Sequence, residues 1–141
     1  MKKNTLISFG IVLVLLAITI IGCGQPSGPP GTPSTVKVKM WATLSSDPNA
    51  TPVTSPTSAQ TVQASFWARG VTEESVRFKV NVNSSDGKFF TMAQDLLTEG
   101  STKAIGIGAL ATPLKPDTYT FTAHSGAFGA VVGSMQIEVT P

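Results

Sequence analysis

The chain has 141 residues, of which 10 are Lys or Arg, 8 are Asp or Glu, one is Cys and one is His. A formal net charge of +2 without a basic stripe excludes a protein that binds nucleic acid by electrostatics. One Cys cannot form an internal disulfide and one His cannot build a histidine metal cage, so we expect no metal and no cofactor. The length supports one domain with a short tail.

Residues 1–22 have the pattern of an export signal. Two lysines follow the initial Met, and the stretch from Leu6 to Gly22 is uncharged and mostly aliphatic. It ends in Ile20-Ile21-Gly22-Cys23, which resembles the bacterial lipobox, with Ile20 where Leu is most common. The resemblance implies that Cys23 receives a diacylglyceryl group, with acyl chains such as palmitate, and that the signal is then cleaved before Cys23. The protein would then be exported and lipid-anchored to the bacterial cell membrane or outer membrane.

Two other interpretations of this segment stay open. As a helix, residues 6–22 would span about 25 Å, close to the ~30 Å apolar core of a bilayer, and could form an uncleaved membrane anchor. Alternatively, ordinary signal cleavage would leave Cys23 as an inert buried thiol. Lipidation is our prediction because the only Cys of the chain lies where the apolar run ends.

Residues 23–35 comprise the expected lipidated Cys and a flexible tether rich in Gly, Pro and Ser. Removal of the signal also removes Lys2 and Lys3, which leaves a mature chain with 8 basic and 8 acidic side chains. A nearly neutral chain has no general attraction to polyanions. Recognition of a partner must therefore depend on shape and local chemistry.

Five segments after the tether alternate apolar and polar residues with a period of two, which is typical of strands with one buried face. These segments are 36–43, 62–69, 76–83, 118–123 and 135–140. Weaker strands are expected at 89–93 and 103–111, and a helical turn at 92–99. Residues 36–141 are therefore expected to form an all-β, antiparallel sandwich of about seven strands without a disulfide.

The polar segment Ser45–Ala59 lies between the first two expected strands. Its Pro, Ser and Thr residues predict a long loop. A short strand around Val53 is the alternative, and the flanking prolines would confine such a strand to a sheet edge.

From Thr61 to the C-terminus, a series of segments resembles a bacterial immunoglobulin-like domain of the invasin/intimin type. The segments that carry the resemblance are Thr61–Phe66, Val76–Val80, Asp86–Phe89, Thr98–Ala104, Leu114–Ala123 and Met135–Val139. The resemblance covers about 80 residues of the chain. It implies an immunoglobulin-like sandwich that serves as a surface adhesion, spacer or protein-interaction module, which is an inference from fold alone.

The arrangement Leu114-x-Pro116-x-x-Tyr119 resembles a tyrosine corner. In that motif a buried Tyr at the start of a strand donates a hydrogen bond to backbone a few residues upstream. The alternative is an ordinary core Tyr, and Tyr119 is structural under either interpretation.

No nucleophile elbow, phosphate loop, dinucleotide fingerprint or paired-Cys motif occurs in the sequence. His124 next to Ser125 is the only candidate catalytic pair, and nothing in the sequence supplies a carboxylate to orient it. We therefore expect a protein that is not an enzyme.

Trp41 and Trp67 fall on the polar face of their expected strands, among basic and amide side chains. If the two strands share a sheet, the indoles could form a flat platform for sugar rings or a peptide. The alternatives are that the Ser45–Ala59 loop covers them or that the assigned strand phase is wrong. The expected partners are the membrane, through the N-terminal lipid, and either another protein or a cell-wall glycan. Binding of carbohydrate or cell wall is thus the alternative function.

Overall fold

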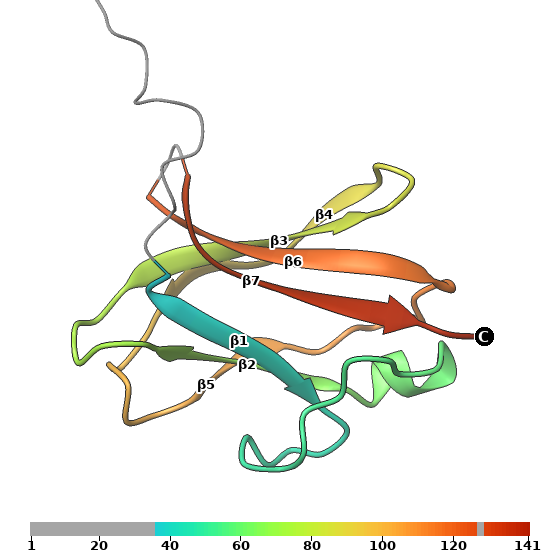
Figure 1. Cartoon of the computed structure of the whole chain (residues 1–141), viewed down its shortest axis with the longest axis horizontal. Coiled ribbons are helices and arrows are strands. Elements are labelled where there is room, and N and C mark those ends of the chain that lie inside the picture. The colour runs from blue at the N-terminus through green and yellow to red at the C-terminus, as the bar shows by residue number, and fades with distance from the viewer. Residues whose placement is uncertain (1–35, 127–128) are drawn as a thin grey trace, which may run out of the picture. The chain divides into compact units, whose positions relative to one another are not determined.

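The computed structural model describes residues 36–126 and 129–141, which form seven β-strands and one short 3₁₀ helix (Figure 1). The elements are β1 (Val38–Thr43), η1 (Ala59–Val62), β2 (Ser65–Gly70), β3 (Arg77–Ser84), β4 (Phe89–Leu97), β5 (Ile105–Gly108), β6 (Asp117–Ser125) and β7 (Ala130–Val139). No helix in these two ranges is long and apolar enough to cross a membrane. The expected signal, Cys23 and the tether lie outside the described residues.

The strands form two sheets in which every neighbouring pair is antiparallel (Figure 1). One sheet has the order β1-β2-β5 and the other has the order β4-β3-β6-β7. β4 therefore belongs to the sheet of β3, β6 and β7. The two sheets form an immunoglobulin-like sandwich. The predicted all-β, seven-stranded antiparallel fold is confirmed.

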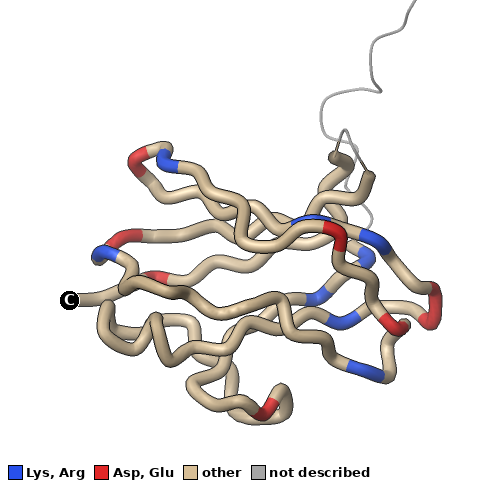
Figure 2. Tube along the Cα trace, turned by 180° about the vertical axis from the view of Figure 1, so that it is seen from behind, with Lys and Arg blue, Asp and Glu red and all other residues tan. Residues whose placement is uncertain are grey.

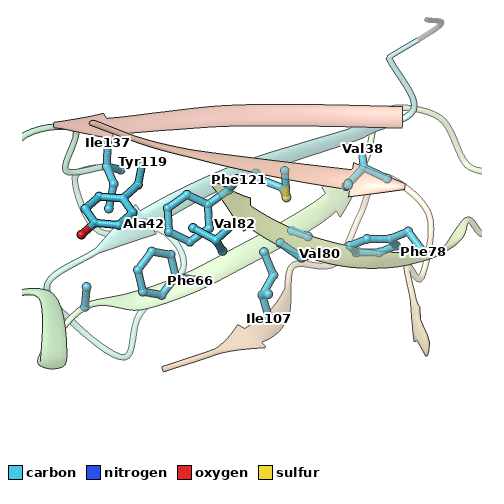
Figure 3. Close-up of a cluster of buried hydrophobic side chains, with 14 of the residues drawn as sticks. Val38, Ala42, Phe66, Phe78, Val80, Val82, Ile107, Tyr119, Phe121 and Ile137 are labelled. Atoms are coloured by element: carbon cyan, nitrogen blue, oxygen red, sulfur yellow. The ribbon is translucent and has the colours of Figure 1, made fainter. Parts of the chain in front are cut away.

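The core lies between the two sheets, and most of its residues are apolar side chains that the period of two had assigned to the buried face (Figure 3). Ile107, Leu114 and Val132 join it from outside the five alternating segments, whereas Val36 and Val62, which were assigned to the buried face, are exposed. At its centre the rings of Phe66 and Phe121 stack with their centroids 5.0 Å apart. Both side chains are fully buried, and Phe78 is buried toward the other end of the core (Figure 3). Because each aromatic ring buries a large apolar area, this group supplies much of the force that holds the sheets together.

Residues 61–64 are not part of a strand, contrary to the sequence prediction. Thr61 ends a turn in which its Oγ1 donates to the Ser58 carbonyl oxygen at 2.6 Å. Thr61 Oγ1 also accepts a hydrogen bond from the backbone N–H of Leu114 at 2.9 Å. One bond within the turn and one to a residue distant in the chain satisfy the buried Thr61 hydroxyl, and the strand starts only at Ser65.

The segment 92–99 is not a helical turn either, because most of it belongs to β4. β4 pairs with β3 in a register that shifts around Val80, and Asp95 has a positive φ of 56°. A helix of eight residues would be marginal alone, whereas the ladder to β3 gives the backbone stable partners. The expected strand at 103–111 is also shorter, since β5 ends at Gly108.

Within the Ser45–Ala59 loop, residues 52–58 run along the edge of the sandwich and contact both sheets. The Val53 N–H donates to the Ala42 carbonyl of β1 at 2.8 Å, and the Glu138 N–H of β7 donates to the Thr54 carbonyl at 2.9 Å. Isolated bridges at Pro52 and Thr57 take the place of the short strand considered from the sequence. The loop thus closes the side of the sandwich between β1 and β7.

The side chain of Tyr119 is buried at the start of β6, and its hydroxyl donates to the Lys115 carbonyl oxygen at 3.1 Å. Leu114 is buried beside it, and Pro116 occupies the exposed turn that leads into β6. This hydrogen bond, four residues back along the chain, has the geometry of a tyrosine corner. Burial raises the pKa of the Tyr119 hydroxyl above its ordinary value of 10.0.

Replacement of Tyr119 by Phe is expected to lower the free energy of unfolding by about 1 kcal/mol, because the Lys115 carbonyl loses its donor while the ring stays. Tyr119 is the only Tyr in the chain, so absorbance at alkaline pH reports its ionisation alone. Folding raises the pKa of the Tyr119 hydroxyl. The contribution of the protonated hydroxyl to the free energy of unfolding is therefore fully present below pH 10.0 and is lost as the pH rises through the folded-state pKa. If chemical denaturation at neutral pH gives wild type and Tyr119→Phe the same free energy of unfolding, a structural role of this hydroxyl is contradicted.

Candidate binding cleft beside Trp41

Trp41 and Trp67 are directly opposite each other on β1 and β2 and share the outer face of the three-stranded sheet. Both indoles are half-buried, and each ring N–H has a partner. The Trp41 Nε1 donates to the Pro48 carbonyl oxygen at 2.9 Å, and the Trp67 Nε1 donates to Thr43 Oγ1 at 2.9 Å. The assigned strand phase is therefore correct, but the indoles do not form a freely exposed platform.

Trp67 is bound into the structure through Thr43. Thr43 is fully buried, and its hydroxyl donates in turn to the Ser45 carbonyl oxygen at 2.7 Å. On the other side, Trp67 is paired with Gly106 of β5. Trp67 thus ties β2 to the loop that follows β1, and it does not line the cleft described next.

A cleft of about 390 Å³ lies beside Trp41 on the outer side of the three-stranded sheet. Its lining consists of Lys39, Trp41, Pro48, Asn49, Ala50, Pro52, Arg69, Thr102, Lys103 and Ala104. These residues come from three parts of the chain, namely β1 with the loop after it, β2, and the segment that leads into β5. Its volume is within the range of small-molecule sites, about 300–1,000 Å³.

The loop wall of the cleft is held by a turn around Asp47. The Asp47 N–H donates to Ser45 Oγ at 2.9 Å, and the Asp47 carboxylate accepts from the Asn49 N–H at 2.8 Å. The Ala50 N–H donates to the Asp47 carbonyl at 3.1 Å. Since the backbone of this turn is internally bonded and also holds Trp41, the indole and the loop wall keep a fixed relative position.

Three of the lining residues are cationic and none is acidic. Lys39 and Arg69 are directly opposite each other across β1 and β2, and the Arg69 guanidinium carbon lies 5.7 Å from the centre of the Trp41 ring. Lys103 pairs with Glu99 at 2.9 Å. The ion pairs among the described residues involve neither Lys39 nor Arg69.

The other candidate chemistry of the sequence is not assembled into a site in the described residues. His124 Nδ1 lies 3.2 Å from the Gly129 carbonyl oxygen, and no hydrogen bond in this part of the chain joins it to Ser125. A hollow of about 300 Å³ beside it is lined by residues that include Arg77 and Asp95, which pair with each other. Within the described ranges, no group of three or more His, Cys, Asp or Glu could hold a metal ion.

Comparison of the chain with protein-family models, with curated proteins and with solved structures gives no match.

Sequence reasoning identified Trp41 but missed the residues that make a cleft around it. Asn49 belongs to a segment assigned only as loop, and Lys103 is 62 positions away from Trp41 in the chain. No local pattern marks these residues, because they reach Trp41 only through the folding of a loop and the pairing of β5 with β2. The alternation places Lys39 and Arg69 on the same face as the two Trp residues. Pairing of these two segments in register would also have placed the two cations opposite each other.

The two Trp residues are expected to differ in their effect on stability. Trp67→Phe should lower the free energy of unfolding by about 1 kcal/mol, because the buried Thr43 hydroxyl loses a donor that water cannot replace. Trp41→Phe should cost less than about 0.5 kcal/mol, since water in the open cleft can bind the Pro48 carbonyl. Urea denaturation of both variants tests this difference, and equal costs would contradict the separate roles.

Proposed function

We propose that the chain is an exported bacterial lipoprotein, held at the membrane through Cys23, whose immunoglobulin-like domain is a non-catalytic surface adhesion module. The observation that carries this proposal is the cleft beside Trp41, where an indole, amide and hydroxyl groups and cations line one hollow. Aromatic and Arg side chains in such positions commonly dominate binding energy. The resemblance to invasin/intimin domains and the tether-like composition of residues 24–35 agree with an adhesion or spacer role.

A non-catalytic role is supported by the surroundings of His124. In the described part of the chain its ring is bonded to a backbone carbonyl, and no nucleophile or carboxylate is hydrogen-bonded to it. General acid–base or nucleophilic catalysis needs such partners within hydrogen-bond reach.

Carbohydrate or cell-wall binding is the second candidate, favoured over a purely protein-binding role by one specific observation. The Trp41 ring is oriented by its hydrogen bond to Pro48, and the side chains of Asn49 and Thr102 next to it make no hydrogen bond to other described residues. Sugar rings bind through an apolar face and peripheral hydroxyls, and this combination of groups matches both needs.

The anchor is tested by mass spectrometry of the native protein. We expect the mature chain to start at Cys23 with a diacylglyceryl group, and Cys23→Ser to leave the chain unlipidated. Ile20→Leu, which brings the sequence closer to the usual lipobox, should leave anchoring unchanged. A mature chain that starts elsewhere, or an unmodified thiol at Cys23, would remove the anchor from the proposal.

The adhesion role is tested by retention of the detergent-solubilised full chain on isolated bacterial cell walls. Trp41→Ala should reduce retention about tenfold or more, because interface aromatics dominate binding. The matched control is Phe89→Ala, which truncates an exposed aromatic of β4 outside the cleft. Retention lost after periodate treatment of the walls indicates carbohydrate, whereas loss after protease treatment indicates a protein partner. Equal retention of wild type and Trp41→Ala would contradict a role of the cleft.

A further inference from the structure

We propose that the cleft beside Trp41 binds a saccharide that carries an acidic group, with the sugar ring against the indole and the carboxylate or phosphate between Lys39 and Arg69. The inference rests on the proposed function, since it specifies the ligand class of the same cleft.

The first argument is the position of the two cations. Lys39 and Arg69 occupy directly opposed positions on neighbouring strands, where like charges are destabilising. No acidic side chain among the described residues forms an ion pair with either of them. An anionic group between them would replace this repulsion by charge-assisted hydrogen bonds, which are roughly twice as strong as neutral ones. The arrangement therefore favours a ligand with a negative charge at this point.

The second argument is the surface next to the cations. The Arg69 guanidinium lies over the Trp41 ring, with its carbon 5.7 Å from the ring centre, and the ring N–H is bonded to Pro48, so the part of the ring that Arg69 leaves uncovered is the surface that a ligand can contact. The side chains of Asn49 and Thr102 supply donors and acceptors for hydroxyl groups. A bare inorganic anion would not use the ring, and a neutral sugar would not use the cations. An acidic sugar uses both.

The third argument is that the positive charge is local. Without Lys2 and Lys3, the chain has as many acidic as basic residues. Figure 2 shows that most Lys and Arg residues lie in the half of the domain away from the C-terminus, where acidic residues are also present. Strong binding to a nucleic acid uses about six to ten phosphate contacts along a continuous basic surface. Three cations in one cleft instead match a ligand with one or two acidic groups.

The experiment measures binding of four oligosaccharide probes to the full chain in detergent micelles by calorimetry and Trp fluorescence. Tri-galacturonate and its neutral methyl ester test a carboxylate, and maltotriose phosphate and maltotriose test a phosphate. We expect at least one acidic probe to bind roughly tenfold or more tightly than its neutral partner, and about 1 M salt to abolish this difference. The preferred acidic probe identifies the acidic group.

Matched variants connect binding to the cleft. Lys39→Gln and Arg69→Gln should each weaken the acidic probe about tenfold, whereas Lys79→Gln on the opposite sheet should not. Lys39→Gln should also leave the free domain as stable as wild type or more stable, because it removes the repulsion from Arg69. A variant that lost binding through misfolding would lose stability as well, so denaturation of each variant separates the two causes.

Three results would overturn the inference. Equal binding of acidic and neutral probes would indicate a carbohydrate site without charge selection, and the proposed adhesion function would stand. Equal binding of polyglutamate and the acidic sugars would indicate a general anion site. No binding of any probe would exclude an acidic saccharide, while retention of the same protein on cell walls would still support the adhesion module.

Discussion

The free edge of β1 is the constraint on which the remaining structure depends. β1 is the outer strand of the three-stranded sheet, so its backbone groups on that side need partners. Just before the strand, the Lys37 N–H bonds to the Val132 carbonyl of β7 at 2.8 Å, and near its end the Ala42 carbonyl accepts from Val53. β7 approaches so closely that a side chain at Gly133 would collide with the Val38 carbonyl. These contacts join the two sheets along one side.

The same closure creates the cleft. To reach Ala42 and then β7, the chain after β1 turns back at Asp47, and the turn is brought over the Trp41 indole. A loop that merely connected two strands would leave both indoles in water. Here the loop divides their roles, since Trp67 becomes part of the sheet-to-loop hydrogen-bond chain while Trp41 faces a hollow. Lys39 and Arg69 place two like charges at directly opposed positions of the sheet, which is locally destabilising. Such departures from a stabilising arrangement are expected at functional positions.

The sequence prediction of the fold succeeded along most of the alternating segments and failed at two short stretches. The buried apolar residues of β3 and β6 follow the period of two along both strands, and Asn81 is an additional buried polar residue of β3. Residues 61–64 also alternate, but the Thr61 hydroxyl bonds to Ser58 and Leu114 and stabilises a turn instead. The segment 92–99 is compatible with helix in isolation, yet β3 provides it with a strand partner. Both errors arose where contacts distant in sequence outweighed local preference.

By itself, the sequence determined most of the side chains that face the core, and hence the class of the fold, because the alternation of a strand is a property of neighbouring residues. It also indicated the outer-face position of Trp41 and the short-range bond of Tyr119, whose partner is only four residues away. Only the tertiary structure decided that Pro48 contacts Trp41 and that Asn49 and Lys103 line the same cleft. The physical reason is that strand order and loop closure depend on backbone pairing between segments distant in the chain, and no local periodicity encodes which segments will pair.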